Sequence, residues 1–444
     1  MENIVSIIAA VLLPLLKFLL QFALAWWWLL LPFVLFRIFI FQWLWWRVDR
    51  YLSFCRWTLL EVKIPQEVDN PFRRMESVLA GIWQVRIGDN KREKWLEGKV
   101  QLGVSLEIAS IEGKTHFYLR SENDDIELLK TSVYAQFPNA EITEVEDYSK
   151  QVPSDIPNKE WNVWGSVYLP LKDDCYPIKT YKQFFEEQAT TSEDEPIRVD
   201  PLGQLLEGMA KLGPGEQMWV QIYISPMRPK DLKPYMAKAK SIVDKIVRRP
   251  ENGKQAGTVR DVESAASLLI TGSPLEEEKK EREDLLPPEM RITPGEREIV
   301  LGIEEKISKT TFDCFIRTMY VAKNDMYLGA MKATPMSYFN QFTTLHMNGI
   351  VVDSDTWTKV HTVSTWFLDK RRLYLRRRRH VRLYRERFPQ PWPRAGGSLL
   401  LNIEELASLY HFPGKLTAPG AEVPRVESKR SEAPAGLPMD FDQP

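Results

Sequence analysis

The stretch from Val100 to Ser121, which reads VQLGVSLEIASIEGKTHFYLRS, decides how the body of this chain is organised. Its first part, Val100–Ile108, alternates apolar side chains with polar or small ones, a pattern typical of a strand with one buried face. The following Ile111-Glu112-Gly113-Lys114 is a turn signal, and His116–Ser121 can return as the second strand. We therefore expect a β-hairpin here.

The segments on either side of this hairpin extend the pattern. Thr58–Pro65 has the composition of a strand, and Phe72–Trp83 repeats apolar residues at helical spacing after Asn70-Pro71. Beyond the hairpin, Asp125–Phe137 predicts a helix and Ala140–Val145 a short strand. The resulting order, β-α-β-β-α-β over residues 55–150, predicts a ferredoxin-like split βαβ module.

A second module with a similar order of elements is expected over residues 158–413. The predicted strands and helices are Trp161–Leu171 (strand), Pro201–Leu212 (helix), Gln217–Ser225 (strand), Phe312–Ala322 (strand) and Lys332–Thr343 (helix). Between its central strands lies a charged helical insertion at 230–294, which begins with the basic stretch Lys230–Arg248. The expected fold class is α+β, with an N-terminal transmembrane helical anchor followed by two ferredoxin-like modules.

The N-terminal segment is almost free of charge. Between Asn3 and Trp46 the charged residues are Lys17 and Arg37, and Phe18–Phe36 alone approaches the roughly 20 apolar residues that cross a bilayer. We expect a membrane anchor at residues 1–50. A signal peptide cleaved after Ala23-Leu24-Ala25 is the alternative, but no Lys or Arg precedes the apolar run, which also continues well past that site.

Two further features orient the anchor. Tryptophan favours the headgroup level of a membrane, which makes six tryptophans candidates for the interface: Trp26, Trp27, Trp28, Trp43, Trp45 and Trp46. Arg47, Arg50 and Arg56 follow the apolar run that ends at Trp46, so the body is expected in the cytoplasm. The number of spans stays open, since Pro14 and Pro32 allow either a helical hairpin or one span plus an interfacial helix.

Composition and motifs argue against several classes of function. The 444 residues include 59 bases and 60 acids, which excludes a wholly basic nucleic-acid protein or an acidic disordered one. The three cysteines are far apart, and none of the five histidines has metal-ligand spacing. Gly113-Lys114-Thr115 resembles the end of a phosphate loop, but Ile108 stands where that motif needs glycine. We expect no enzyme activity, metal or cofactor.

The most strongly charged segment, residues 370–387, reads KRRLYLRRRRHVRLYRER and contains ten bases against one acid. The bases are Lys370, Arg371, Arg372, Arg376, Arg377, Arg378, Arg379, Arg382, Arg385 and Arg387. Such a patch, interleaved with Leu and Tyr, can neutralise phosphates of a nucleic acid. It can equally bind anionic lipid, or form a solvated or protein-docking face. All three alternatives stay open.

The C-terminal region predicts a short capped helix and a tail. Asn402 precedes the helix and Glu405 follows three residues later, which is the spacing of a capping box. From Lys415 onward the chain is rich in Pro, Ala, Glu, Ser and Lys. Residues 414–444 are therefore expected to be a Pro-rich disordered tail.

Several runs resemble one bacterial family. They are Gly103–Ile108 (GVSLEI), Ala135–Tyr148 (AQFPNAEITEVEDY), Asp200–Ile224 (DPLGQLLEGMAKLGPGEQMWVQIYI) and Leu401–Pro413 (LNIEELASLYHFP). Together they are similar to the membrane-anchored N-terminal module, a domain of unknown function, of type IV secretion and conjugative DNA-transfer ATPases. In that family a motor domain follows this point, whereas this chain is expected to lack the motor.

The resemblance implies a location and a set of partners. The location is the bacterial cytoplasmic (inner) membrane, with the body in the cytoplasm. The implied partners are membrane lipid, a separately encoded motor ATPase, DNA and further copies of the chain. The expected function is a non-catalytic platform or accessory subunit of a type IV secretion or DNA-transfer machine. The alternative is a membrane-tethered nucleic-acid-binding protein that acts through residues 370–387.

Overall fold

The computed structural model describes most of the chain in two compact units. The described residues are 2–65, 68, 70–83, 90–186, 200–247, 292–354, 356–358, 360, 366–387, 399–414, 420 and 422–426, with little more than the backbone for 2–30. The first unit contains residues 1–56 and 87–102, and the second contains 57–86 and 103–444. Each unit is described by itself below.

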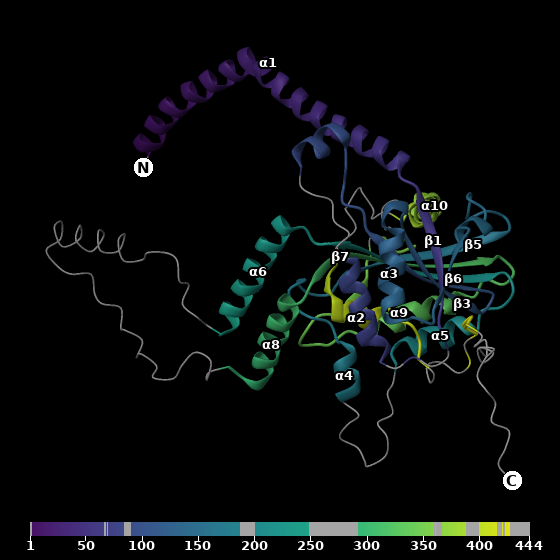
Figure 1. The fold of residues 1–444 in the computed structure, drawn as a ribbon. Helices are drawn as coiled ribbons and strands as arrows, with labels where there is room; N and C mark the ends of the chain where they lie inside the picture. Colours follow the sequence, from purple (N-terminus) through teal and green to yellow (C-terminus); the bar gives the residue numbers. More distant parts are fainter. Residues whose placement is uncertain are drawn as a thin grey trace, which may run out of the picture. The chain divides into compact units, whose positions relative to one another are not determined.

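The first unit is built on one long helix, α1 (Glu2–Phe54). It is continuous, which excludes a helical hairpin, and it bends near its middle (Figure 1). Pro32 lies in the middle of the helix, where proline cannot donate a backbone hydrogen bond and kinks a helix. At 1.5 Å per residue, 53 residues extend about 80 Å, well over the ~30 Å of a hydrocarbon core.

A short π-helical turn, η1 (Glu93–Glu97), packs against α1 in this unit. The indole Nε1 of Trp43 donates a hydrogen bond of 3.2 Å to the carbonyl of Trp95. Gly98, with φ +75°, follows the turn, and a Cβ there would lie 2.4 Å from the backbone of Arg47. Glycine at this position therefore allows the close approach of the loop to the helix.

The second unit contains one antiparallel sheet of nine strands among the described residues. The strands are β1 Trp57–Lys63, β2 Val104–Ile111, β3 Lys114–Glu122, β4 Glu141–Val145, β5 Trp161–Pro170, β6 Glu216–Pro226, β7 Thr311–Lys323, β8 Ile350–Val352 and β9 Leu399–Asn402. Their spatial order is β4-β1-β3-β2-β6-β7-β5-β8, and β9 pairs with β7. The expected hairpin is β2–β3, with Ile111 opposite Lys114.

The sheet runs without interruption through both expected modules. Strands β2 and β6 pair antiparallel along their length, with Ile108 opposite Val220, and so join the two halves. Two separate ferredoxin-like modules are therefore not confirmed. What is confirmed is a mixed α/β fold with an antiparallel sheet and an N-terminal apolar helix.

In the second unit the helices predicted at 72–83, 125–137, 201–212 and 332–343 are confirmed within a few residues, whereas the helices at 181–186 and 294–308 were not predicted. They are α2 Pro71–Ile82, α3 Ile126–Gln136, α4 Tyr181–Glu186, α5 Leu202–Ala210, α6 Pro229–Val247, α8 Pro294–Ser308, α9 Ala333–Asn340, α10 Asp369–Glu386 and α11 Ile403–Leu409. Asn402 and Glu405 form the predicted capping box at the start of α11. The segment Lys230–Arg248 is helical through Val247, as α6.

Each face of the sheet has its own hydrophobic cluster. On one face, strand residues such as Leu60 and Ile222 pack against α2, α3, α5, α9 and α11. On the other face, Tyr118, Trp219 and Met319 pack against α10 and the segment 148–156. Because successive strand residues point to opposite faces, the polar residues between the apolar ones on β2 and β3 point toward α10.

Two predicted segments are described only in part. In the insertion at 230–294, α6 packs against α8, which begins where the insertion ends, through Tyr235, Val243 and Ile303. Residues 248–291 lie outside the described residues. In the tail at 414–444, Glu422 and Arg425 form parallel bridges to Lys114 and Ile64. The described residues 422–426 therefore lie against the sheet, and most of the remaining tail is outside the description.

Candidate functional site

Helix α10 carries the basic segment and divides its charges between two sides. Five of the ten bases are exposed: Lys370, Arg371, Arg372, Arg378 and Arg382. Arg376, Arg377, Arg379 and Arg385 are half-buried, and Arg387 is buried. His380, Val381 and Tyr384 form the apolar side that faces the sheet. The structure therefore does not present the ten bases as one surface.

Three of the half-buried arginines are used to hold α10 in place. Arg376 donates a hydrogen bond of 2.7 Å to the carbonyl of Trp357, and Arg377 donates one of 2.8 Å to the side chain of Asn162. Arg385 donates to the carbonyls of Ser149 and Val152. These hydrogen bonds fix the positions of the three side chains.

Arg387 ends α10 and forms the centre of a buried ionic cluster. Its backbone has φ +53°, which turns the chain out of the helix, and its side chain is 1% exposed. The Nε atom lies 2.9 Å from Oε1 of Glu107, and Nη2 lies 3.1 Å from Oε2. The same guanidinium also pairs with both carboxylate oxygens of Asp147. One cation therefore binds two acids.

Neutral groups complete the hydrogen bonds of Glu107. Ser105 donates to its Oε1 at 2.7 Å, and Tyr148 donates to its Oε2 at 2.6 Å. The hydroxyl of Tyr148 lies 2.6 Å from that of Tyr384, so α10 is joined to the network a second time. A buried carboxylate needs this density of donors because it has lost its water.

The ionic cluster shifts the pKa values of its members. Burial alone would raise the pKa of Asp147, but the hydrogen bonds and charge of Arg387 outweigh burial and lower it to about 2. For Glu107 burial also opposes ionisation, yet Arg387 lowers the pKa below its ordinary value. Both acids are therefore ionised at neutral pH.

We expect the Asp147 carboxylate to make stability depend on acid pH. Its folded pKa is below the ordinary value of 3.8, so its contribution is complete above about pH 4 and is lost as the pH falls toward 2. The free energy of unfolding of the Asp147→Asn variant should be about 2 kcal/mol below that of the wild type at pH 6. Urea unfolding measured from pH 6 to pH 2 should show this difference shrinking, and a constant difference would contradict the assignment.

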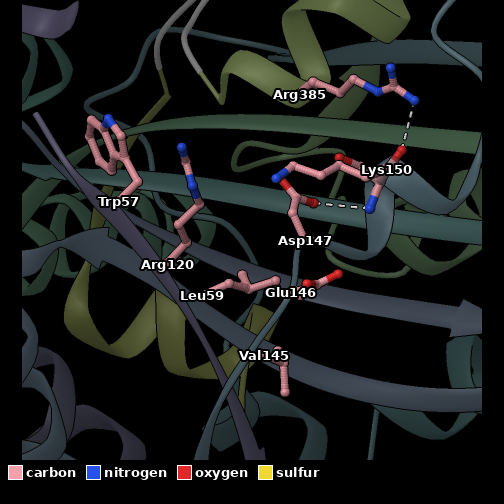
Figure 2. Close-up of a pocket in the computed structure, with 9 residues that line it drawn as sticks. Trp57, Leu59, Arg120, Val145, Glu146, Asp147, Lys150 and Arg385 are labelled. Carbon is pink, nitrogen blue, oxygen red and sulfur yellow. Dashed lines mark hydrogen bonds between the residues drawn. The ribbon is translucent and has the colours of Figure 1, made fainter.

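A pocket of about 540 Å³ opens beside this cluster (Figure 2). Its lining residues are Trp57, Leu59, Arg120, Val145, Glu146, Asp147, Ser149, Lys150 and Arg385. They come from β1, β3, the end of β4, the turn after it and α10. In Figure 2, Trp57 and Arg120 lie at one side, and Asp147, Lys150 and Arg385 face them from the other.

Arg120 is a half-buried cation in the wall of the pocket. Its guanidinium carbon lies 4.5 Å from the centre of the Trp57 ring, and no hydrogen bond or ion pair joins its side chain to another residue in the described part of the chain. Burial, with a contribution from the like charge of Arg387, lowers the pKa of Arg120 to about 10. The group therefore remains a cation at neutral pH.

The structure describes the side chains of three of the six tryptophans of the anchor. The side chains of Trp26, Trp27 and Trp28 lie outside the described residues. Trp43, Trp45 and Trp46 are exposed, and they fall within Leu31–Phe54, a stretch of α1 long and apolar enough to cross a membrane. The guanidinium of Arg47 lies 5.6 Å from the Trp43 ring.

Sequence reasoning missed the residues with which the basic segment interacts. Glu107 occupies a polar position on an alternating strand, and such positions usually face water. In the structure that face is covered by α10. The sequence analysis also assigns no role to Trp95, whose carbonyl accepts a hydrogen bond from Trp43 in the first unit. The signal that could have indicated this contact is a single Trp in a charged stretch of sequence.

The fold and site define a mixed α/β protein with an N-terminal apolar helix and a buried ionic cluster between its sheet and a basic helix. Among the described residues, no group of three or more His, Cys, Asp or Glu side chains is arranged to hold a metal ion. A family model described as "Domain of unknown function (DUF8128)" matches residues 55–415, so the chain belongs to that family. A comparison with curated proteins found no match.

Proposed function

We propose that this protein is a membrane-anchored, non-catalytic platform that positions a separately encoded motor ATPase of a bacterial secretion or DNA-transfer machine. The observation that carries the proposal is the apolar surface of α1, where Phe33, Phe39 and Phe41 are each more than 60% exposed. A helix that exposes so much aromatic surface needs lipid or protein around it. The parts of the proposal that concern the motor ATPase and the secretion or DNA-transfer machine rest on the sequence resemblance.

The aromatic and basic residues near the end of α1 support a definite orientation. Arg47 lies over the rings of both Trp43 and Trp46, and Arg50 lies over Trp46. Tryptophan and arginine together are typical of the headgroup level on the cytoplasmic side. We place the body, which follows at Trp57, in the cytoplasm beneath the inner membrane.

The continuous sheet suits a platform better than a catalyst. We propose that the sheet consists of two ferredoxin-like halves, β4-β1-β3-β2 and β6-β7-β5-β8, fused through β2 and β6; the strand order supports this proposal. Beneath α10, Arg387 binds Glu107 and Asp147, so these charged groups hold the helix on the sheet. We propose that further copies of the chain assemble around the motor.

Affinity capture of the full-length protein from native membranes tests the platform. We expect a protein with a phosphate-binding loop to be recovered in amounts comparable to the bait after mild detergent extraction. An unrelated single-span protein of similar abundance, captured in parallel, is the control. Recovery of no such ATPase from crosslinked native membranes, with the bait intact, would count against the proposal.

One observation favours nucleic-acid binding as a second candidate. Arg371, Arg378 and Arg382 are spaced by seven and four residues, which places them on one exposed side of α10. Tyr374 and Leu375 are exposed between them, and Tyr374 accepts a hydrogen bond of 3.0 Å from Arg378. This outer stripe, unlike Arg376 and Arg377, is available to phosphates.

Replacing Arg371, Arg378 and Arg382 with Gln separates this candidate from the platform. If three phosphate contacts are lost, the slope of log affinity for DNA against log salt should become less steep by about two to three. The control replaces three exposed bases of α6, Lys233, Lys240 and Lys245, with Gln. An unchanged slope in the α10 variant, or an equal change in both, would exclude the stripe as the binding surface.

A further inference from the structure

We propose that the pocket at Trp57, Arg120 and Lys150 is a binding site for a ligand that carries a phosphate ester. The site is separate from the platform function and does not depend on it, since every residue that lines it belongs to the second unit. The inference rests on three properties of the pocket: its charge, its size and its walls.

Bases outnumber acids among the side chains that line the pocket. Arg120, Lys150 and Arg385 line it together with two acids, Glu146 and Asp147. Asp147 is already bound by Arg387 and by the amide of Ser149 at 2.9 Å. Within the described chain, Arg120 has no acid partner of its own. A cation that is half-buried and unpaired is costly, and a bound anion removes that cost.

The bases can approach one anionic group from different directions. Arg120 stands on β3 beside Trp57, whereas Lys150 and Arg385 come from the opposite side of the pocket (Figure 2). Arg385 is held by two backbone carbonyls, so its position is fixed before any ligand arrives. A phosphate ester carries up to two negative charges and three acceptor oxygens, which matches several converging donors better than a single carboxylate does.

The size and the lining of the pocket indicate a ligand with an organic group as well as an anionic one. A volume of about 540 Å³ falls within the range of pockets that hold small organic ligands. Trp57, Leu59 and Val145 supply an apolar wall next to the bases. An organic group attached to the phosphate can therefore lie on that wall while the phosphate binds Arg120.

Two sources can supply this chemistry, a phospholipid headgroup and a soluble phosphate ester. Trp57 follows Phe54, the last residue of α1, by three positions in the chain. That short connection is the reason to include a lipid arm in the test. The probes are inorganic phosphate and AMP as soluble ligands, and phosphatidic acid as the lipid.

The experiment uses the full-length protein in phosphatidylcholine nanodiscs. Titration calorimetry should show that AMP binds more tightly than inorganic phosphate, and that Arg120→Gln weakens AMP binding roughly 10- to 100-fold. Arg73→Gln, an exposed position on α2, has the same change of charge and should bind as the wild type does. If phosphatidic acid in the nanodisc weakens AMP binding, the lipid occupies the site, and if not, the soluble ester does.

A second variant guards against misfolding. Lys150 is exposed, so Lys150→Gln should keep the thermal unfolding midpoint of the wild type and still bind AMP more weakly. The proposal is overturned if the wild type binds neither phosphate nor AMP and phosphatidic acid raises the unfolding midpoints of wild type and Arg120→Gln equally. It is also overturned if both variants bind AMP with wild-type affinity.

Discussion

The Arg387→Met variant is expected to lower the free energy of unfolding by about 3–5 kcal/mol, because it leaves the buried Glu107 and the half-buried Asp147 without their cation. Glu107 is fully buried, and its two oxygens lie within 3.1 Å of the guanidinium. Met has a similar apolar length, so packing changes little and the loss of charge dominates. Urea unfolding of the full chain in detergent, followed by tryptophan fluorescence, measures the effect.

The control for this variant lies on the same helix. Arg382→Met removes an arginine whose side chain is 69% exposed and whose partner Glu386 is 3.9 Å away, and it should change stability by less than about 0.5 kcal/mol. In the double variant Arg387→Met, Glu107→Gln, the Glu107 carboxylate that had lost its cation is replaced by a neutral amide. We therefore expect that adding Glu107→Gln recovers part of the lost stability, with a coupling of about 1–3 kcal/mol. Strictly additive effects would show that the two residues do not form the pair described.

Local patterns in the sequence predicted the elements well and their assembly less well. The hairpin of β2 and β3 was predicted from alternation and a turn signal within about twenty residues. The pairing of β2 with β6 joins residues more than a hundred positions apart, and no local signal reports it. The expectation of two separate modules followed from reading each local pattern by itself.

In the basic segment, too, the local sequence did not predict which side chains interact with distant residues. Its composition indicated ten equivalent bases, whereas the helix directs some toward the sheet and others toward solvent. The burial of Val381 and Tyr384 shows which side of the helix faces the sheet. The partner of Arg387 could not be inferred, because Glu107 is 280 residues away in the chain.

Glu405→Ala is expected to lower the free energy of unfolding as much as Arg387→Met does. Glu405 was predicted as a cap, and its Oε2 accepts from the amide of Asn402 at 2.9 Å. In addition, its Oε1 accepts from the amide of Ile178 at 2.9 Å and lies 3.2 Å from Nζ of Lys306. Removing the carboxylate undoes the cap and leaves a fully buried lysine unpaired, so the free energy of unfolding should fall by about 3–5 kcal/mol.

The same variant tests what the run Leu401–Pro413 does. If this run is structural, Glu405→Ala should destabilise the body, and Lys306→Met in the same chain should recover part of the loss because no unpaired charge remains. Glu127→Ala, at a side chain that is 83% exposed on α3, should change stability by less than about 0.5 kcal/mol. A Glu405→Ala protein that unfolds like the wild type but no longer captures its partner would assign the run to docking. If Glu405→Ala lowers both stability and partner capture, the run Leu401–Pro413 has a structural role in the body.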